Sequence, residues 1–128
     1  MKLKLRDMTI FNRIFDAERG YLLDFSDRTI TLFFDEELNI DIDDEQYKED
    51  GTSKAKRVRC LLKKVDADTA LRILDRLWLY RMSIDASGAM KDQAEYYALI
   101  ESIKGLDDNL SAGLPPKKSF FGIDYIEN

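Results

Sequence analysis

The chain of 128 residues is 45% hydrophobic and 35% charged, a composition that suits one folded domain with a strongly charged surface. Its net charge of −5 opposes binding to a phosphate backbone, and its lack of histidine excludes enzymes that depend on a Ser-His pair, a Cys-His pair or an imidazole base. The chain also lacks an apolar run long enough to cross a membrane and an N-terminal signal peptide, so we expect a cytoplasmic protein.

Apolar residues recur at helical spacing in two stretches near the start of the chain. Residues 6–16 predict a short helix capped by Asp7, and Ser26 or Asp27 is the predicted cap of a second helix. Two threonines in the second stretch favour a strand, which leaves that alternative open there. The side chains expected in the core are Met8, Phe11, Phe15, Ile30, Phe33, Phe34 and Leu38.

Residues 39–51 predict a polar loop that is rich in acids, with Ile40 and Ile42 as its only aliphatic anchors. Thr52 or Ser53 then caps a helix that has one apolar face and one cationic face. The apolar face consists of Ala55, Val58, Leu61, Leu62 and Val65. The cations expected to project from the opposite side are Lys56, Arg59 and Lys63.

A long central helix is predicted after Asp66, which is its expected cap. The side chains that this helix is expected to bury are Leu71, Leu74, Leu77, Trp78 and Met82. After a break around Gly88, residues 91–105 repeat the apolar spacing of a last helix, which Gly105 is expected to close.

These elements predict an all-α fold, a compact bundle of five to six helices over residues 1–105. Residues 106–128 differ in character, because Pro115 and Pro116 forbid a helix and the residues that follow are rich in apolar and aromatic side chains. We expect an irregular apolar C-terminal tail that docks on the bundle or forms part of an interface.

Carboxylate-rich patterns do not amount to a metal or catalytic site. Asp41, Asp43 and Glu45 have the spacing of the first calcium ligands in a binding loop, but Gln46 stands where the sharp turn needs glycine. The other acids fall at a helix end and in a loop, where water and not a cleft surrounds them. Cys60, the only cysteine, is expected to be a buried and inert thiol. We therefore expect no catalytic residue, no metal and no cofactor.

The acidic loop followed by a basic helix is the main functional feature of the sequence. A solvated face, a contact with phosphates and a contact between proteins are its three interpretations. The candidate basic face is Lys54, Lys56, Arg57, Arg59 and Lys63, and the candidate acidic loop is Asp41, Asp43, Asp44 and Glu45. Contact between copies requires the cations around Arg59 to point outward and to be free of carboxylates of their own chain.

The run LFFDEELNIDIDDEQYKEDGTSKAKRVRCLLKKVDADTALRILDRLW resembles small helical adaptor domains of the effector-associated or death-like type, found at the N-termini of bacterial conflict proteins. The upstream run FDAERGYLLDFSDRTITLFF is similar to N-terminal domains of abortive-infection (antiphage) proteins, and together the two runs cover about residues 7 to 84. The resemblance implies a non-catalytic bundle that recruits or multimerises an effector through homotypic contacts. By that analogy, Lys56, Arg59 and Lys63 meet acids of the loop of a neighbouring copy.

We therefore predict a non-enzymatic protein–protein interaction or adaptor domain in bacterial antiphage defence. It associates with itself as an oligomer, or recruits an effector, through complementary acidic and basic surfaces. The alternative is a regulatory protein that binds nucleic acid with the basic helix at residues 54–64. We expect neither a membrane nor a small molecule as a partner.

Overall fold

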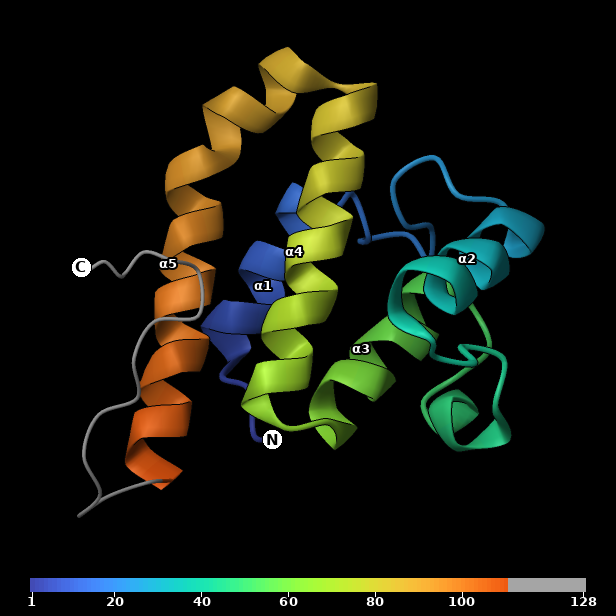
Figure 1. Ribbon diagram of the computed structural model, residues 1–128, viewed down its shortest axis with the longest axis horizontal. Helices are drawn as coiled ribbons and strands as arrows, with labels where there is room; N and C mark the ends of the chain where they lie inside the picture. Colours follow the sequence, from blue (N-terminus) through green and yellow to red (C-terminus); the bar gives the residue numbers. More distant parts are fainter. Residues whose placement is uncertain (111–128) are drawn as a thin grey trace.

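The computed structural model in Figure 1 describes residues 1–110, with side chains through residue 106, and this part of the chain is all-helical without strands. The α-helices are α1 (Leu5–Ile14), α2 (Asp27–Phe33), α3 (Lys54–Lys64), α4 (Ala67–Ile84) and α5 (Ala86–Leu110). A π-helical turn, η1 (Phe34–Leu38), follows α2, and a 3-10 turn, η2 (Glu45–Lys48), lies in the loop before α3. The predicted all-α fold is confirmed. The stretch for which a strand was the alternative is helical, as α2.

Two groups of elements share one core. Helices α4 and α5 form an antiparallel hairpin with α1 packed against α5, while α2, η1 and the loop with η2 lie on the other side of α4 (Figure 1). The Trp78 ring stacks on Tyr96 at 4.3 Å and meets the edge of Phe15, which joins α4, α5 and the end of α1. At the edge of this group, Arg81 donates to Ile14 O and to Asp92, each at 2.7 Å.

Three of the predicted helix caps are confirmed. The Ser26, Ser53 and Asp66 side chains each accept a hydrogen bond from a backbone N–H three residues later, at 3.1, 3.2 and 2.8 Å. The prediction that Asp7 caps α1 is wrong, because the helix begins at Leu5. Asp7 instead lies in the first turn, 1% exposed, and its carboxylate accepts the Lys4 N–H at 3.0 Å.

The two glycines that we expected to interrupt the last helix do not do so. Asp85 alone separates α4 from α5, and its carboxylate accepts the Gly88 N–H at 3.1 Å, which caps the first turn of α5. Helix α5 then passes through Gly105 to Leu110. The rest of the expected tail, residues 111–128, lies outside the described residues.

Most of the expected core residues are buried. Ile42 and Leu61 are fully buried and Cys60 is 2% exposed, as predicted, but Met82, which was expected in the core, is 46% exposed and borders an open hollow between the end of α4 and the start of α5. No helix in the described range combines the length and the apolar character that a membrane span requires.

Candidate interaction surface

The cations of α3 face carboxylates and carbonyls of their own chain. Arg57, expected on the outward basic face, has a side chain that is only 5% exposed. Its three nitrogens donate to Thr52 O at 3.1 Å, to Asp43 at 2.5 Å and to Asp27 at 3.4 Å. Because the apolar stripe of α3 is wide enough to include position 57, this guanidinium lies inside the fold and forms no part of an outer surface.

Arg59 is also turned inward. Its guanidinium donates to Asn12 Oδ1 at 2.9 Å and to Ala17 O at 3.1 Å, so it joins α3 to α1 and to the loop that follows α1. We expected the cations around Arg59 to point outward and to be free for another polypeptide. For Arg59 itself this expectation is wrong.

The lysines of α3 divide between paired and free positions. Lys63 contacts Asp50 at 2.6 Å, which lowers the pKa of that carboxyl through the hydrogen bond and the charge of the lysine. Lys64 contacts Glu49 at 2.9 Å, and this hydrogen bond raises the pKa of the lysine. Lys54 lies over the Tyr21 ring and 3.8 Å from Asp27. Lys56 is exposed and forms no ion pair within residues 1–106.

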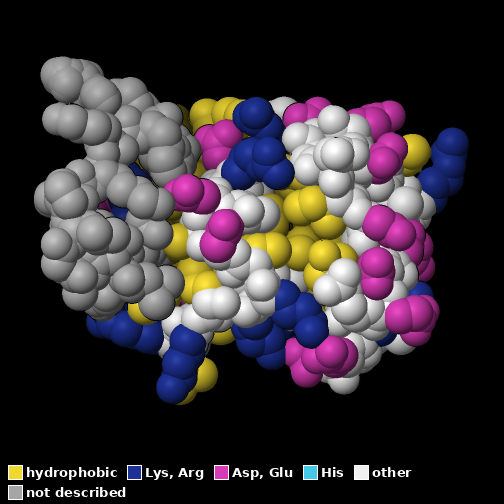
Figure 2. Space-filling model, turned by 60° about the horizontal axis from the view of Figure 1, so that its bottom comes forward, with side chains coloured by type: hydrophobic (Ala, Val, Ile, Leu, Met, Phe, Trp, Pro, Cys, Tyr) yellow, Lys and Arg dark blue, Asp and Glu magenta, His cyan; other side chains and the backbone are white. Residues whose placement is uncertain are grey.

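The acidic segment, by which we mean residues 35–50, has an excess of negative charge at the surface. All nine of its carboxylates are exposed: Asp35, Glu36, Glu37, Asp41, Asp43, Asp44, Glu45, Glu49 and Asp50. Four of them, Asp35, Glu36, Asp41 and Asp44, have no cationic partner among the described side chains. Asp41 and Asp44 accept backbone N–H groups of their own loop, each at 3.0 Å. Figure 2 shows acidic side chains gathered on the right, the side that carries α2 and this loop.

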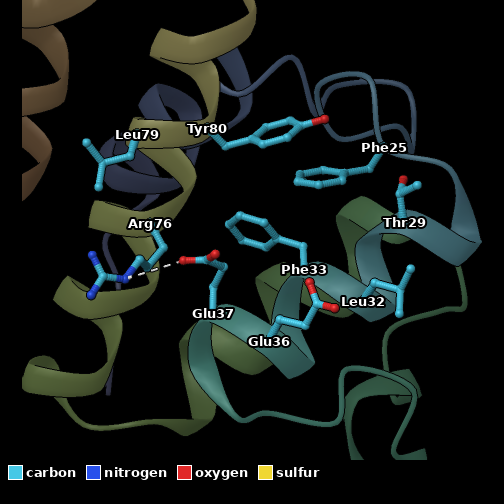
Figure 3. A pocket seen from close by; sticks show the side chains of 9 residues that line it. All are labelled: Phe25, Thr29, Leu32, Phe33, Glu36, Glu37, Arg76, Leu79 and Tyr80. Carbon is cyan, nitrogen blue, oxygen red and sulfur yellow. Dashed lines mark ion pairs between the residues drawn. The ribbon is translucent and has the colours of Figure 1, made fainter.

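An apolar groove opens beside this acidic segment, between α2 with η1 on one wall and α4 on the other (Figure 3). It encloses about 490 Å³. Its residues are Phe25, Thr29, Leu32, Phe33, Glu36, Glu37, Arg76, Leu79 and Tyr80. We call it the acidic groove, because Glu36 and Glu37 stand on its rim, while its one cation, Arg76, contacts Asp75 at 3.1 Å and Glu37 at 3.9 Å.

Three aromatic rings in mutual contact form the floor of the acidic groove. Phe25 and Tyr80 stack with ring centroids 4.3 Å apart, and Phe33 meets both rings at an angle. The Tyr80 hydroxyl donates to Asp24 at 2.5 Å, and burial together with this hydrogen bond raises its pKa to about 12. A preformed apolar floor with charged groups at its edge can accept an apolar side chain without first rearranging.

Sequence reasoning missed this groove. It assigned apolar faces to α2 and α4 but left out Leu32 and Leu79, which are 41% and 50% exposed and line the opening. Two leucines outside the core-facing stripes of neighbouring helices were the available signal, because such side chains leave apolar surface open to a partner.

Within residues 1–106, no three His, Cys, Asp or Glu side chains come together in an arrangement that could hold a metal ion. The carboxylates of Asp41 and Asp44 instead accept hydrogen bonds from backbone N–H groups of the same loop. Comparison with protein-family models, with curated proteins and with solved structures gives no match for this chain.

Proposed function

We propose that this chain is a non-catalytic protein-interaction domain that binds a basic and partly apolar segment of another polypeptide in the acidic groove. The observation that carries the proposal is the groove itself: an aromatic floor, two exposed leucines and carboxylates on the rim. Apolar contact supplies affinity at such a site, while the rim carboxylates select and steer cationic segments.

The charges of α3 support this choice of surface. Arg57, Lys63 and Lys64 of this helix pair with acids of their own chain and so are not free to bind a partner. The surface beside the groove stays negative because four of its carboxylates have no cationic partner among the described side chains. The alternative of nucleic-acid binding through α3 loses its main support, because phosphates would have to displace these partners and approach nearby unpaired carboxylates. A cationic protein segment meets neither obstacle.

The wider role we propose follows the resemblance to effector-associated domains. A domain of this kind would act as an adaptor in bacterial antiphage defence, which recruits an effector or multimerises it. The acidic groove, and not the basic face of α3, is the surface we assign to that contact.

A peptide array tests the proposed function directly. We expect the protein to retain peptides in which a Leu, Ile or Phe is flanked by Lys or Arg, and to release them as salt rises. Glu36→Lys and Leu79→Asp should each abolish retention, since one reverses a rim charge and the other places a charge on the apolar wall.

Matched controls come from α5, on the far side of the molecule (Figure 1). The Glu101 side chain is 72% exposed, with Lys104 Nζ at 3.5 Å, and Met90 is 76% exposed. Glu101→Lys and Met90→Asp repeat the same chemical changes there and should leave retention intact. Retention that is equal in the groove and control variants, or that favours acidic peptides, would reject the proposal.

A further inference from the structure

The chain contains a segment with the chemistry that the acidic groove selects. Leu5, the first residue of α1, is 85% exposed and is the most exposed large apolar side chain among the described residues. Lys4 and Arg6 flank it in the sequence, Lys2 lies nearby, and all three are exposed. We call Lys2, Lys4, Leu5 and Arg6 the N-terminal knob.

The knob is held in place and is free of charged partners. The Asp7 carboxylate accepts the Lys4 N–H at 3.0 Å, and Asp7 itself is buried, so the first turn of α1 fixes the direction of Leu5. The Lys2, Lys4 and Arg6 side chains form no ion pair within the part of the chain that the structure describes. The knob therefore presents one apolar side chain among three unpaired cations.

We propose that the acidic groove takes the N-terminal knob of a second copy of this chain. Leu5 enters between Leu32 and Leu79 and covers the aromatic floor. The knob cations meet the rim carboxylate Glu36, which has no cationic partner among the described side chains. Charge and apolar character match on both sides of this contact.

The fold makes this a contact between copies. The knob consists of the first residues of α1 and the residues just before them, and α1 packs against α5, whereas α2, η1 and α4 form the groove. Since knob and groove are different surfaces, each copy can use both at once. The contact is therefore head-to-tail, and repeated contacts close a ring or extend a filament.

The interface is small, so association should be weak and sensitive to salt. One leucine and a few ion pairs bury less surface than a permanent dimer needs, and rim charges are screened within about 10 Å at 0.1 M salt. Self-association should therefore be seen at high protein concentration and low salt and should disappear as salt is raised.

Complementary variants of the full chain test this arrangement by sedimentation velocity at low salt. Leu5→Glu removes the knob but keeps the groove, and Glu36→Lys alters the groove but keeps the knob. We expect wild type to form species larger than a dimer and each variant alone to remain monomeric. An equal mixture of the two variants should form dimers and nothing larger, because only one productive contact is possible.

Circular dichroism of each variant checks that the fold is intact, and Met90→Glu is the control for a new charge at another strongly exposed apolar site. A monomeric wild type, a Leu5→Glu variant that still associates, or a mixture that stays monomeric would overturn the inference. Loss of association in Met90→Glu would also overturn it, since the α4–α5 hairpin would then be the interface.

This inference rests on the proposed function, because it names a partner for the same groove. The two can fail separately. The Leu5→Glu variant keeps an intact groove and should still retain basic, partly apolar peptides. Peptide retention without self-association would leave the proposed function standing and remove the second copy as its partner.

Discussion

Arg57 brings together three segments that lie far apart in the sequence. Its nitrogens reach Asp27 at the start of α2, Asp43 in the acidic loop and Thr52 O just before its own helix. Each hydrogen bond joins a cation to an oxygen, and two of the acceptors are carboxylates. Such charge-assisted bonds are stronger than neutral ones.

Replacing Arg57 by Met should lower the free energy of unfolding by about 1 to 2 kcal/mol. The methionine keeps the apolar stem but removes every hydrogen bond, whereas Asp43 and Asp27 are exposed enough to regain water, which limits the loss. Urea denaturation measures the change. Lys56→Met, an exposed position on the same helix, should stay within about 0.5 kcal/mol of wild type. Equal stabilities for the two variants would show that the Arg57 contacts contribute nothing.

The burial of Arg57 could be predicted from the sequence, but its hydrogen-bond partners could not. Position 57 is four residues before Leu61, so helical spacing places it beside the apolar stripe and indicates partial burial. Its acidic partners are 14 and 30 residues upstream, and which of the many acids would reach it depends on how the loop folds. Periodicity describes neighbours within a helix and carries no information about such distant pairs.

At the scale of elements, the acidic loop between η1 and α3 is fixed by apolar anchors and ion pairs, and the partly buried Ile40 and Tyr47 pack against the core beside Ile42. Ile42 is fully buried, as predicted, and Asp43, Glu49 and Asp50 each contact a cation of α3. The cations of α3 thus hold the loop against the helix. The same charge pattern that predicted contacts between copies serves this internal contact.

Exchanging the charges of one loop contact tests this role. Lys63→Glu and Asp50→Lys should each speed the hydrogen exchange of the amides in η2, because each variant places two like charges where a 2.6 Å ion pair stood. The double variant restores opposite charges and should return exchange toward the wild-type rate. If the single variants exchange like wild type, the ion pairs do not order the loop.

Helix positions were easier to predict than helix boundaries. A serine or aspartate cap accepts a hydrogen bond from a backbone N–H in the first turn of its helix, and Ser26, Ser53 and Asp66 all do so. Glycine only weakens a helix, so tertiary packing decides whether it ends one. Helix α5 packs against α1 and α4, with Gly88 in the first turn that Asp85 caps, and it continues through Gly105.

At the scale of the whole molecule, the surface ion pairs predict how stability depends on pH. Lys63 holds the pKa of Asp50 below its usual value of about 3.9. A carboxyl whose pKa is lower in the folded state contributes its stability above the unfolded pKa and loses it as pH falls through the folded value. The pKa of Lys64 is raised by Glu49, so its contribution is present below about 10.4 and is lost as pH rises through the folded value.

The melting temperature should therefore change little between these two limits and fall outside them. Asp50→Asn should reduce the part of the fall below about pH 4, and Lys64→Gln should reduce the part above about pH 10. Thermal denaturation of the three proteins across this range measures both effects. Each variant should act mainly at its own end, because the first cause of each pKa shift is the direct partner of that group. A variant that flattens neither end would show that other groups control the response. A general effect of the net charge of −5 would act differently, because Asp50→Asn makes that charge less negative and Lys64→Gln makes it more negative, so it would move the two variants in opposite directions across the whole pH range.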